Sequence, residues 1–168
     1  ESVAIQLSRI LDKANVPFNV TGFQGNTGTV RSDATGASDN LAVRYEAPRL
    51  IPFKTWRESL QRASAKLGSI NEWATSATPD YSSISLALED LAGRSEFRKI
   101  LFLLTDANGY NTANMKFLQS IADREGIKIV AIGIGNTQVK ECFRSAENVR
   151  NVGDLTSTSF NKLLKELQ

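Results

Sequence analysis

The stretch KILFLLTD at residues 99–106 decides the fold class of this chain, because it is an apolar run that ends in a carboxylate. A strand that is apolar without alternation is typical of burial on both faces, as in the centre of a parallel sheet. A second such run, IKIVAIGI, occupies residues 127–134. The segment between the two runs has helical spacing. Two buried strands joined through a helix need a crossover connection, so the pattern predicts a parallel α/β sheet.

The rest of the chain continues this alternation of strands and helices. Apolar spacing predicts helices at residues 2–15, 53–67, 82–92, 112–125, 139–144 and 156–167. Strands are predicted at residues 18–23, 41–47, 99–105, 127–134 and 148–152, and the polar residues 24–40 are predicted to form a loop. We therefore expect a doubly wound, mostly parallel sheet with helices on both faces, in a single domain over residues 1–168.

Composition limits the chemistry that this chain can perform. Its 168 residues carry a net charge of +2 spread along the chain, which argues against a nucleic-acid partner. Its apolar runs are too short to span a membrane. With one cysteine and no histidine, zinc sites and histidine-based triads are excluded, and a reducing, cytoplasmic location is expected. Any metal must be held by oxygen, which favours magnesium, manganese or calcium.

Asp106 is the first candidate for a functional residue. Ligands of open α/β sheets bind beyond the carboxyl ends of the strands, and Asp106 follows the strand at residues 99–105 directly. We expect this carboxylate to be partly desolvated and to need a compensating cation. The alternative is that Asp106 only caps the next helix or orders the turn with Asn108 and Gly109.

A second group of oxygen-bearing side chains lies in the sequence TPDYSS at residues 78–83. If the alternation holds, this loop also lies at the carboxyl edge of the sheet, and two oxygen-rich loops at one edge favour a metal site more than either loop alone does. The alternative for Ser82 and Ser83 is that one of them caps the following helix. Cys142 has no base nearby in the sequence, so we interpret it as a partly buried thiol.

These segments together resemble a von Willebrand factor A (vWA) domain. KILFLLTDANG, a helix and IKIVAIGIG are similar to the second half of that fold, and DYSSISLALEDL is similar to a segment of the CobT and NorD proteins. AIQLSRILDKANVPFNVTGF and RLIPFKTWRESLQRASAKLG resemble further parts of CobT, the subunit of aerobic cobaltochelatase. The resemblance implies a metal-ion-dependent adhesion site (MIDAS) with Asp106 as one ligand. It also implies either Asp80 or, in another register, Ser82 from the second loop.

One part of the family pattern is not found between residues 1 and 168. The family's first strand and its D-x-S-x-S metal-binding loop have no counterpart, and DATGA at residues 33–37 follows a polar flank that cannot be a central strand. We expect the chain to be part of a longer one, or the strand to come from elsewhere. Binding of Mg²⁺ is accordingly expected to be weak or absent.

The resemblance implies a non-catalytic subunit that works with a CobS-like AAA+ ATPase and a large chelatase subunit in metal insertion into a tetrapyrrole. ATP hydrolysis would belong to the partner, because the chain has no G-x-x-x-x-G-K-[ST] loop. Two other functions are kept as alternatives. One is a Mg²⁺-dependent phosphoryl-transfer domain that uses Asp106 and Asp80, and the other is an adhesion-type vWA domain.

Overall fold

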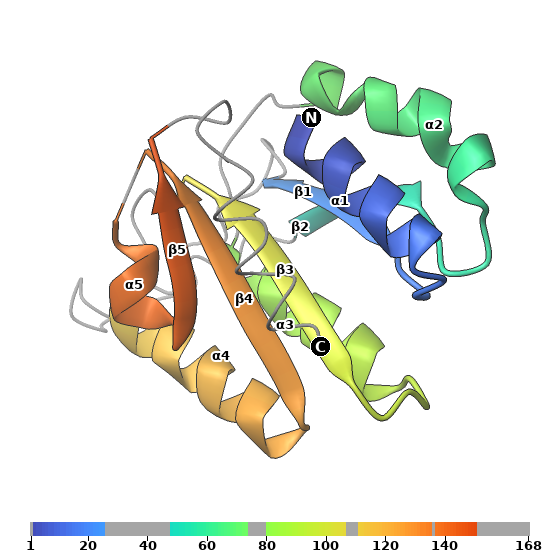
Figure 1. Ribbon diagram of the computed structural model, residues 1–168. Helices are drawn as coiled ribbons and strands as arrows, with labels where there is room; N and C mark the ends of the chain where they lie inside the picture. The colour runs from blue at the N-terminus through green and yellow to red at the C-terminus, as the bar shows by residue number, and fades with distance from the viewer. Residues whose placement is uncertain (1, 26–47, 74–79, 107–110, 136, 151–168) are drawn as a thin grey trace. The chain divides into compact units, whose positions relative to one another are not determined.

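The computed structural model describes residues 2–25, 48–73, 80–106, 111–135 and 137–150 (Figure 1). The chain divides into two compact units, unit 1 over residues 1–83 and unit 2 over residues 84–168. Helix α3 (Asp80–Ala92) contributes its first turn to unit 1 and the remainder to unit 2.

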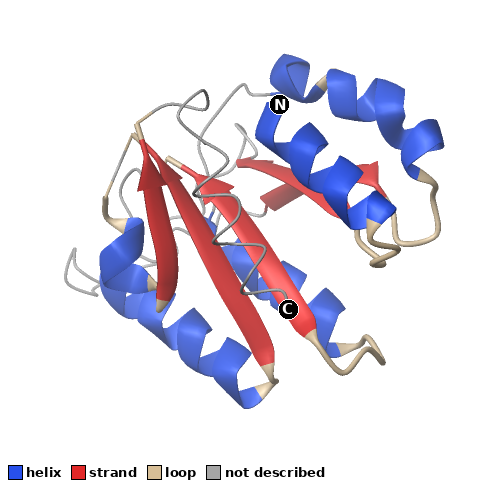
Figure 2. Ribbon diagram, in the orientation of Figure 1, coloured by secondary structure: helices blue, strands red, loops and turns tan. Residues whose placement is uncertain are grey.

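Unit 2 is built on a parallel sheet of three described strands. The strands β3 (Lys99–Thr105), β4 (Ile127–Ile134) and β5 (Ser145–Val149) lie in the order β3-β4-β5. Helix α4 (Thr112–Arg124) connects β3 to β4, and the short helix α5 (Val139–Cys142) connects β4 to β5. Figure 2 shows the strands in red running in the same direction, with helices beside them. The mixed α/β fold class is confirmed, as are the bounds of β3 and β4.

The two apolar runs form the centre of unit 2. Lys99 to Thr105 pairs residue by residue with Ile127 to Gly133, without a register shift. In β4 only Lys128 is exposed, so this strand is buried on both faces as its sequence predicts. Val130, Ile132 and Val149 form a buried cluster against which side chains of β3 pack.

Helix α4 begins and ends where its local sequence places it. The side chain of Asn111 accepts a hydrogen bond from the backbone N–H of Asn114 at 3.1 Å, which satisfies one of the free donors of the first turn. Gly126, just beyond the helix, has a φ of 66°, a conformation that costs glycine little. The predicted end of this helix at Gly126 is confirmed.

Besides the first turn of α3, the described part of unit 1 contains a pair of antiparallel strands and two α-helices. Helix α1 (Ser2–Lys13) is followed by β1 (Val20–Gly25), which pairs with β2 (Pro48–Lys54). Helix α2 (Leu60–Gly68) and the 3-10 helix η1 (Ile70–Trp73) complete the unit. Its buried cluster consists of Phe53, Ala63 and Leu67, with Ile5 of α1 and Val20 of β1 packed against it.

The predicted helix at residues 53–67 starts too early. Phe53 and Lys54 end strand β2, and α2 begins only at Leu60. Ser59 sets this boundary, because its hydroxyl accepts a hydrogen bond from the backbone N–H of Arg62 at 3.3 Å. The apolar residues of the extended segment before α2 happen to have helical spacing, although they are not helical. The capping residue Ser59 marks where the helix begins.

Gly22 is required by the packing of this strand pair. A Cβ atom at position 22 would lie 2.5 Å from Cε2 of Phe53, closer than van der Waals contact allows. The aromatic ring therefore occupies the space that any side chain at position 22 would need. This contact positions Phe53 over β1 and against helix α2.

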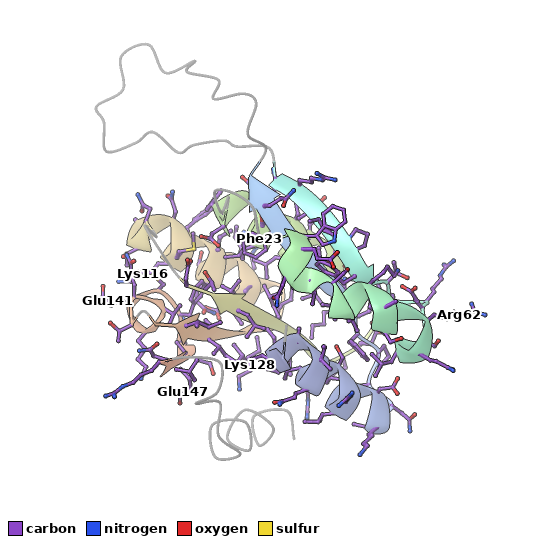
Figure 3. All side chains as sticks on the ribbon, turned by 90° about the horizontal axis from the view of Figure 1, so that it is seen from above. Phe23, Arg62, Lys116, Lys128, Glu141 and Glu147 are labelled. Atoms are coloured by element: carbon purple, nitrogen blue, oxygen red, sulfur yellow. The ribbon has the colours of Figure 1, made fainter. Side chains whose placement is uncertain are left out.

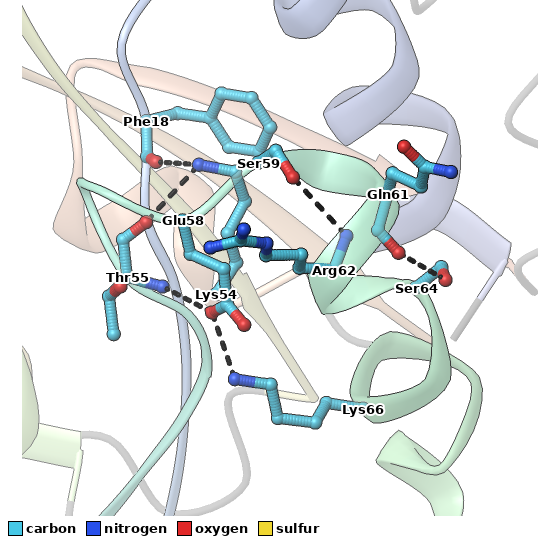
Figure 4. A network of polar contacts seen from close by, with 9 residues as sticks. All are labelled: Phe18, Lys54, Thr55, Glu58, Ser59, Gln61, Arg62, Ser64 and Lys66. Carbon is cyan, nitrogen blue, oxygen red and sulfur yellow. Dashed lines mark hydrogen bonds and ion pairs between the residues drawn. The ribbon is translucent and has the colours of Figure 1, made fainter.

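A network of polar contacts joins β2 to the segment before β1 (Figure 4). The ammonium group of Lys54 donates to the carbonyl oxygens of Phe18 at 2.7 Å and Thr55 at 3.2 Å. It also lies 4.0 Å from the centre of the Phe18 ring. Glu58 accepts from Lys66 of α2 at 2.8 Å and from the backbone N–H of Thr55 at 3.3 Å.

Several predicted elements differ from the structure or lie beyond its described part. The strand expected at residues 148–152 is β5, which lies earlier, at Ser145–Val149. The strand expected at residues 41–47 and the last helix, at residues 156–167, lie outside the described residues, as does nearly all of the loop at 24–40. Among the described residues, no helix is both long and apolar enough to cross a membrane.

Candidate functional site: the carboxyl edge of the parallel sheet

The three parallel strands of unit 2 end at one edge of their sheet, which we call the carboxyl edge (Figure 1). In the register, Thr105 of β3 pairs with Gly133 of β4, and Ile134 of β4 pairs with Val149 of β5. The residues that follow these strands, Asp106, Gly135 and Arg150, therefore emerge side by side.

Asp106 lies at this edge, immediately after β3, as predicted, but its surroundings differ from the prediction. The residue is exposed, so the expected partial desolvation of its carboxylate is wrong. The buried polar residue at the strand end is Thr105, whose exposed fraction is 7%. The chain leaves the sheet directly after Thr105, which places the following side chain in solvent. An exposed carboxylate is accessible to a cation or to a protein partner.

Asp80 and Ser82 lie in the first turn of α3, which starts at Asp80. The prediction that Ser82 or Ser83 caps this helix from outside is wrong, because both are already helical. Asp80 is buried, with 6% of its surface exposed, and Ser82 is partly buried. A carboxylate in the first turn of a helix is stabilised by the partial positive charge of the helix N-terminus.

Gly135 and Arg150 belong to the same edge and were not predicted as site residues. Gly135 has a φ of 73°, and its N–H donates to the carbonyl oxygen of Val149 at 2.8 Å. This bond fixes the turn after β4 against the end of β5. Arg150, the next residue, is exposed. The sequence signal was obscured because residues 148–152 were predicted to be one strand.

Cys142 is not a candidate nucleophile. Its side chain lies in α5 with 3% of the residue exposed. Burial raises the pKa of the thiol, and a hydrogen bond with Thr112 offsets this only in part. A thiol with a raised pKa is protonated at neutral pH and reacts slowly. Cys142 is therefore more deeply buried than the partly buried thiol that the sequence predicts.

The donor atoms at the predicted site residues fit a hard divalent cation. Asp106 and Asp80 supply carboxylate oxygens and Ser82 a hydroxyl oxygen, the ligand types that Mg²⁺ and Ca²⁺ take in proteins. Within the part of the chain that the structure describes, no group of three or more His, Cys, Asp or Glu side chains is placed to hold a metal ion. Any metal site here therefore depends on few carboxylates together with hydroxyl or external ligands.

Several charged side chains of the described residues lie at the surface of each unit. Figure 3 shows Arg62 of α2 at the periphery of unit 1, and Lys116, Glu141 and Glu147 at that of unit 2. Arg144 pairs with Asp123 of α4 at 3.0 Å, and Lys140 with Glu147 at 3.9 Å. These ion pairs join α4 and α5 to the segments beside them.

Comparison with protein families gives one match over almost the entire chain. The family described as "Cobalamin biosynthesis protein CobT VWA domain" matches residues 1–167. The match covers both units, including α1 and the strand pair of unit 1. Comparisons with curated proteins and with solved structures give no match.

Proposed function

The chain belongs to the CobT VWA-domain family of cobalamin biosynthesis, and from this premise we propose that it is a metal-ion-dependent protein-interaction domain. One observation carries the proposal. Asp106 presents an exposed carboxylate where a buried strand of the parallel sheet ends. This is the edge at which open α/β folds bind their ligands.

The proposed ion is Mg²⁺, held by oxygen ligands. Asp106 is one proposed ligand, and the other is Asp80 or, in the alternative register, Ser82, both in the first turn of α3. So few protein ligands would leave a bound Mg²⁺ ion only partly neutralised. When bound, the ion would supply a positive charge that attracts an acidic side chain of a partner protein.

The proposed partner is an AAA+ ATPase, acting with a large chelatase subunit in the insertion of a metal into a tetrapyrrole. In this arrangement the partner hydrolyses ATP and the present chain docks. The absence of a phosphate-binding G-x-x-x-x-G-K-[ST] motif from the 168 residues supports this division of roles. The proposed site of action is the cytoplasm.

The test is a binding measurement between the chain and a CobS-like AAA+ ATPase, in Mg²⁺ and in EDTA. Asp106→Asn removes the charge while keeping the shape, and we expect it to weaken binding at least tenfold, an effect as large as that of EDTA. Glu89→Gln is the matched control, because Glu89 is an exposed carboxylate on α3 within the same unit. Binding that is unchanged in EDTA and with Asp106→Asn would exclude the metal-dependent function.

The same assay tests whether Asp80 belongs to the same ion site. Asp80→Asn alone is expected to weaken Mg²⁺-dependent binding, and the double variant with Asp106→Asn is expected to lose little more than either single one. Such non-additivity is typical of two groups that act on one ligand. Additive losses would assign Asp80 a separate role.

A further inference from the structure

The carboxyl edge of unit 2 carries a cation as well as a carboxylate. Asp106 follows β3 and Arg150 follows β5, the two strands on either side of β4. Both residues are exposed. Adjacent strands are about 4.8 Å apart, so the two backbone positions lie about 10 Å from each other.

The backbone at Arg150 is fixed relative to the rest of this edge. Val149, the residue before it, pairs with Ile134 and accepts a hydrogen bond from the N–H of Gly135. The carbonyl oxygen of Arg150 lies 3.8 Å from the position that a Cβ atom on Gly135 would occupy. The turn after β4 therefore fixes where the Arg150 side chain emerges from the sheet.

The guanidinium of Arg150 differs from the other cations around α5 and β5. Lys140 is paired with Glu147, and Arg144 with Asp123. Within the described ranges, no ion pair or hydrogen bond engages the Arg150 side chain. A guanidinium presents several donors in one plane and forms paired hydrogen bonds with a carboxylate.

We propose that Arg150 binds a carboxylate of the same partner segment that reaches Asp106, so that the partner is recognised by two acidic side chains about 10 Å apart. This inference rests on the proposed function and specifies the partner. In a polyproline II segment, which has three residues per turn and advances about 3.1 Å per residue, acidic residues three positions apart lie on the same face at about this separation. One meets the ion at Asp106, and the other meets the guanidinium of Arg150.

The experiment uses the 168-residue chain and two fluorescent peptides in a Gly/Ser background, measured by fluorescence anisotropy in Mg²⁺. One peptide carries Glu at positions i and i+3, and the other carries Glu at i and Gln at i+3. We expect the wild type to bind the first peptide roughly tenfold more tightly than the second. Arg150→Gln is expected to abolish this difference and Arg150→Lys to retain part of it. Arg124→Gln, on an exposed arginine at the end of α4, is expected to leave it unchanged.

Three results would overturn the inference: equal binding of the two peptides by the wild type, a preference that survives Arg150→Gln, or no binding of either peptide. Tighter Mg²⁺ binding by Arg150→Gln with an unchanged peptide preference would also overturn it, because Arg150 would then act as an internal counter-charge of Asp106. The proposed function fails separately, if ATPase binding depends on neither Mg²⁺ nor Asp106.

Discussion

Units 1 and 2 enclose different kinds of side chain. The central strand of unit 2 buries isoleucine, valine and alanine, and its exposed charges sit at the ends of strands and helices. Unit 1 encloses the ammonium group of Lys54, with 4% of the residue exposed, and the hydroxyl of Ser8, with 1% exposed. Both units have a buried apolar cluster, and unit 1 in addition buries an ammonium group whose hydrogen bonds must be satisfied.

This difference bears on function. A site that binds a partner needs a framework whose geometry is fixed, and the carboxyl edge is the end of the apolar sheet of unit 2. The polar contacts of unit 1 act elsewhere, holding β2, the segment before β1 and the start of α2 together. Because Trp56 and Trp73 both lie in unit 1, tryptophan fluorescence reports on that unit, while circular dichroism reports on both.

The largest effect is expected from Ile132→Ala, which tests the apolar half of the comparison. Ile132 is fully buried in β4, with 0% exposed, so the truncation should lower the free energy of unfolding by about 2–5 kcal/mol. Urea unfolding followed by circular dichroism measures this. Leu86→Ala is the control, because Leu86 is 40% exposed and should lose less than about 1 kcal/mol. Equal losses in the two variants would show that the buried side chains of β4 contribute no more to the stability of unit 2 than an exposed one does.

A smaller effect is expected from Lys54→Met, which keeps the length of the side chain but removes its donors. The carbonyls of Phe18 and Thr55 lose their contacts, which should lower the free energy of unfolding by about 1–2 kcal/mol. Tryptophan fluorescence during urea unfolding follows this loss in unit 1.

The same variant has a pH signature. Burial lowers the pKa of Lys54 below 10.5, against the opposing charges of Asp12 and Glu58. Between the lowered pKa and 10.5, the unfolded chain binds a proton that the folded chain has released, so the stability of the wild type rises with pH. The free energy of unfolding of the wild type should therefore increase relative to that of Lys54→Met as the pH rises through this alkaline range. A stability difference that is flat or falling there would contradict a buried, desolvated ammonium.

The smallest effect is expected from Ser8→Ala, and it has the opposite sign. The hydroxyl of Ser8 is buried in α1 and makes no hydrogen bond with the described part of the protein. Its removal should raise the free energy of unfolding by about 0.5–1 kcal/mol. The cost of burying an unbonded hydroxyl disappears, and alanine has a higher helix propensity than serine. Ser64→Ala in α2 is the matched control, because the Ser64 hydroxyl donates to Gln61 at 2.7 Å. If Ser8→Ala raises the free energy of unfolding no more than Ser64→Ala does, the Ser8 hydroxyl has a hydrogen-bond partner after all.

The sequence predicted unit 2 better than unit 1, for a physical reason. Strands β3 and β4 are apolar throughout, and a strand buried on both faces leaves a pattern that needs no knowledge of its neighbours. In contrast, β2 contains two prolines and a buried lysine, and its contacts depend on Phe18 and Gly22 far away in the chain. Such contacts are properties of the folded state, so periodicity assigned Phe53 to a helix.

The candidate site was predictable only in part. The position of Asp106 follows from the end of β3, but its exposure depends on where the chain turns away after Thr105. The position of Arg150 follows from the pairing of β5 with β4 and from the bond between Gly135, just after β4, and Val149 at the end of β5. Sequence spacing gives the order of strand ends, and tertiary hydrogen bonds decide which side chains meet there.

The contact between Gly22 and the Phe53 ring has a consequence for how this chain can change over generations. A side chain at position 22 meets the ring at 2.5 Å, so it is tolerated only together with a smaller residue at position 53. A smaller residue at position 53 alone leaves a cavity beside Ala63 and Leu67. Neither substitution is easily accepted first, so the two positions should vary as a pair among descendants of this sequence.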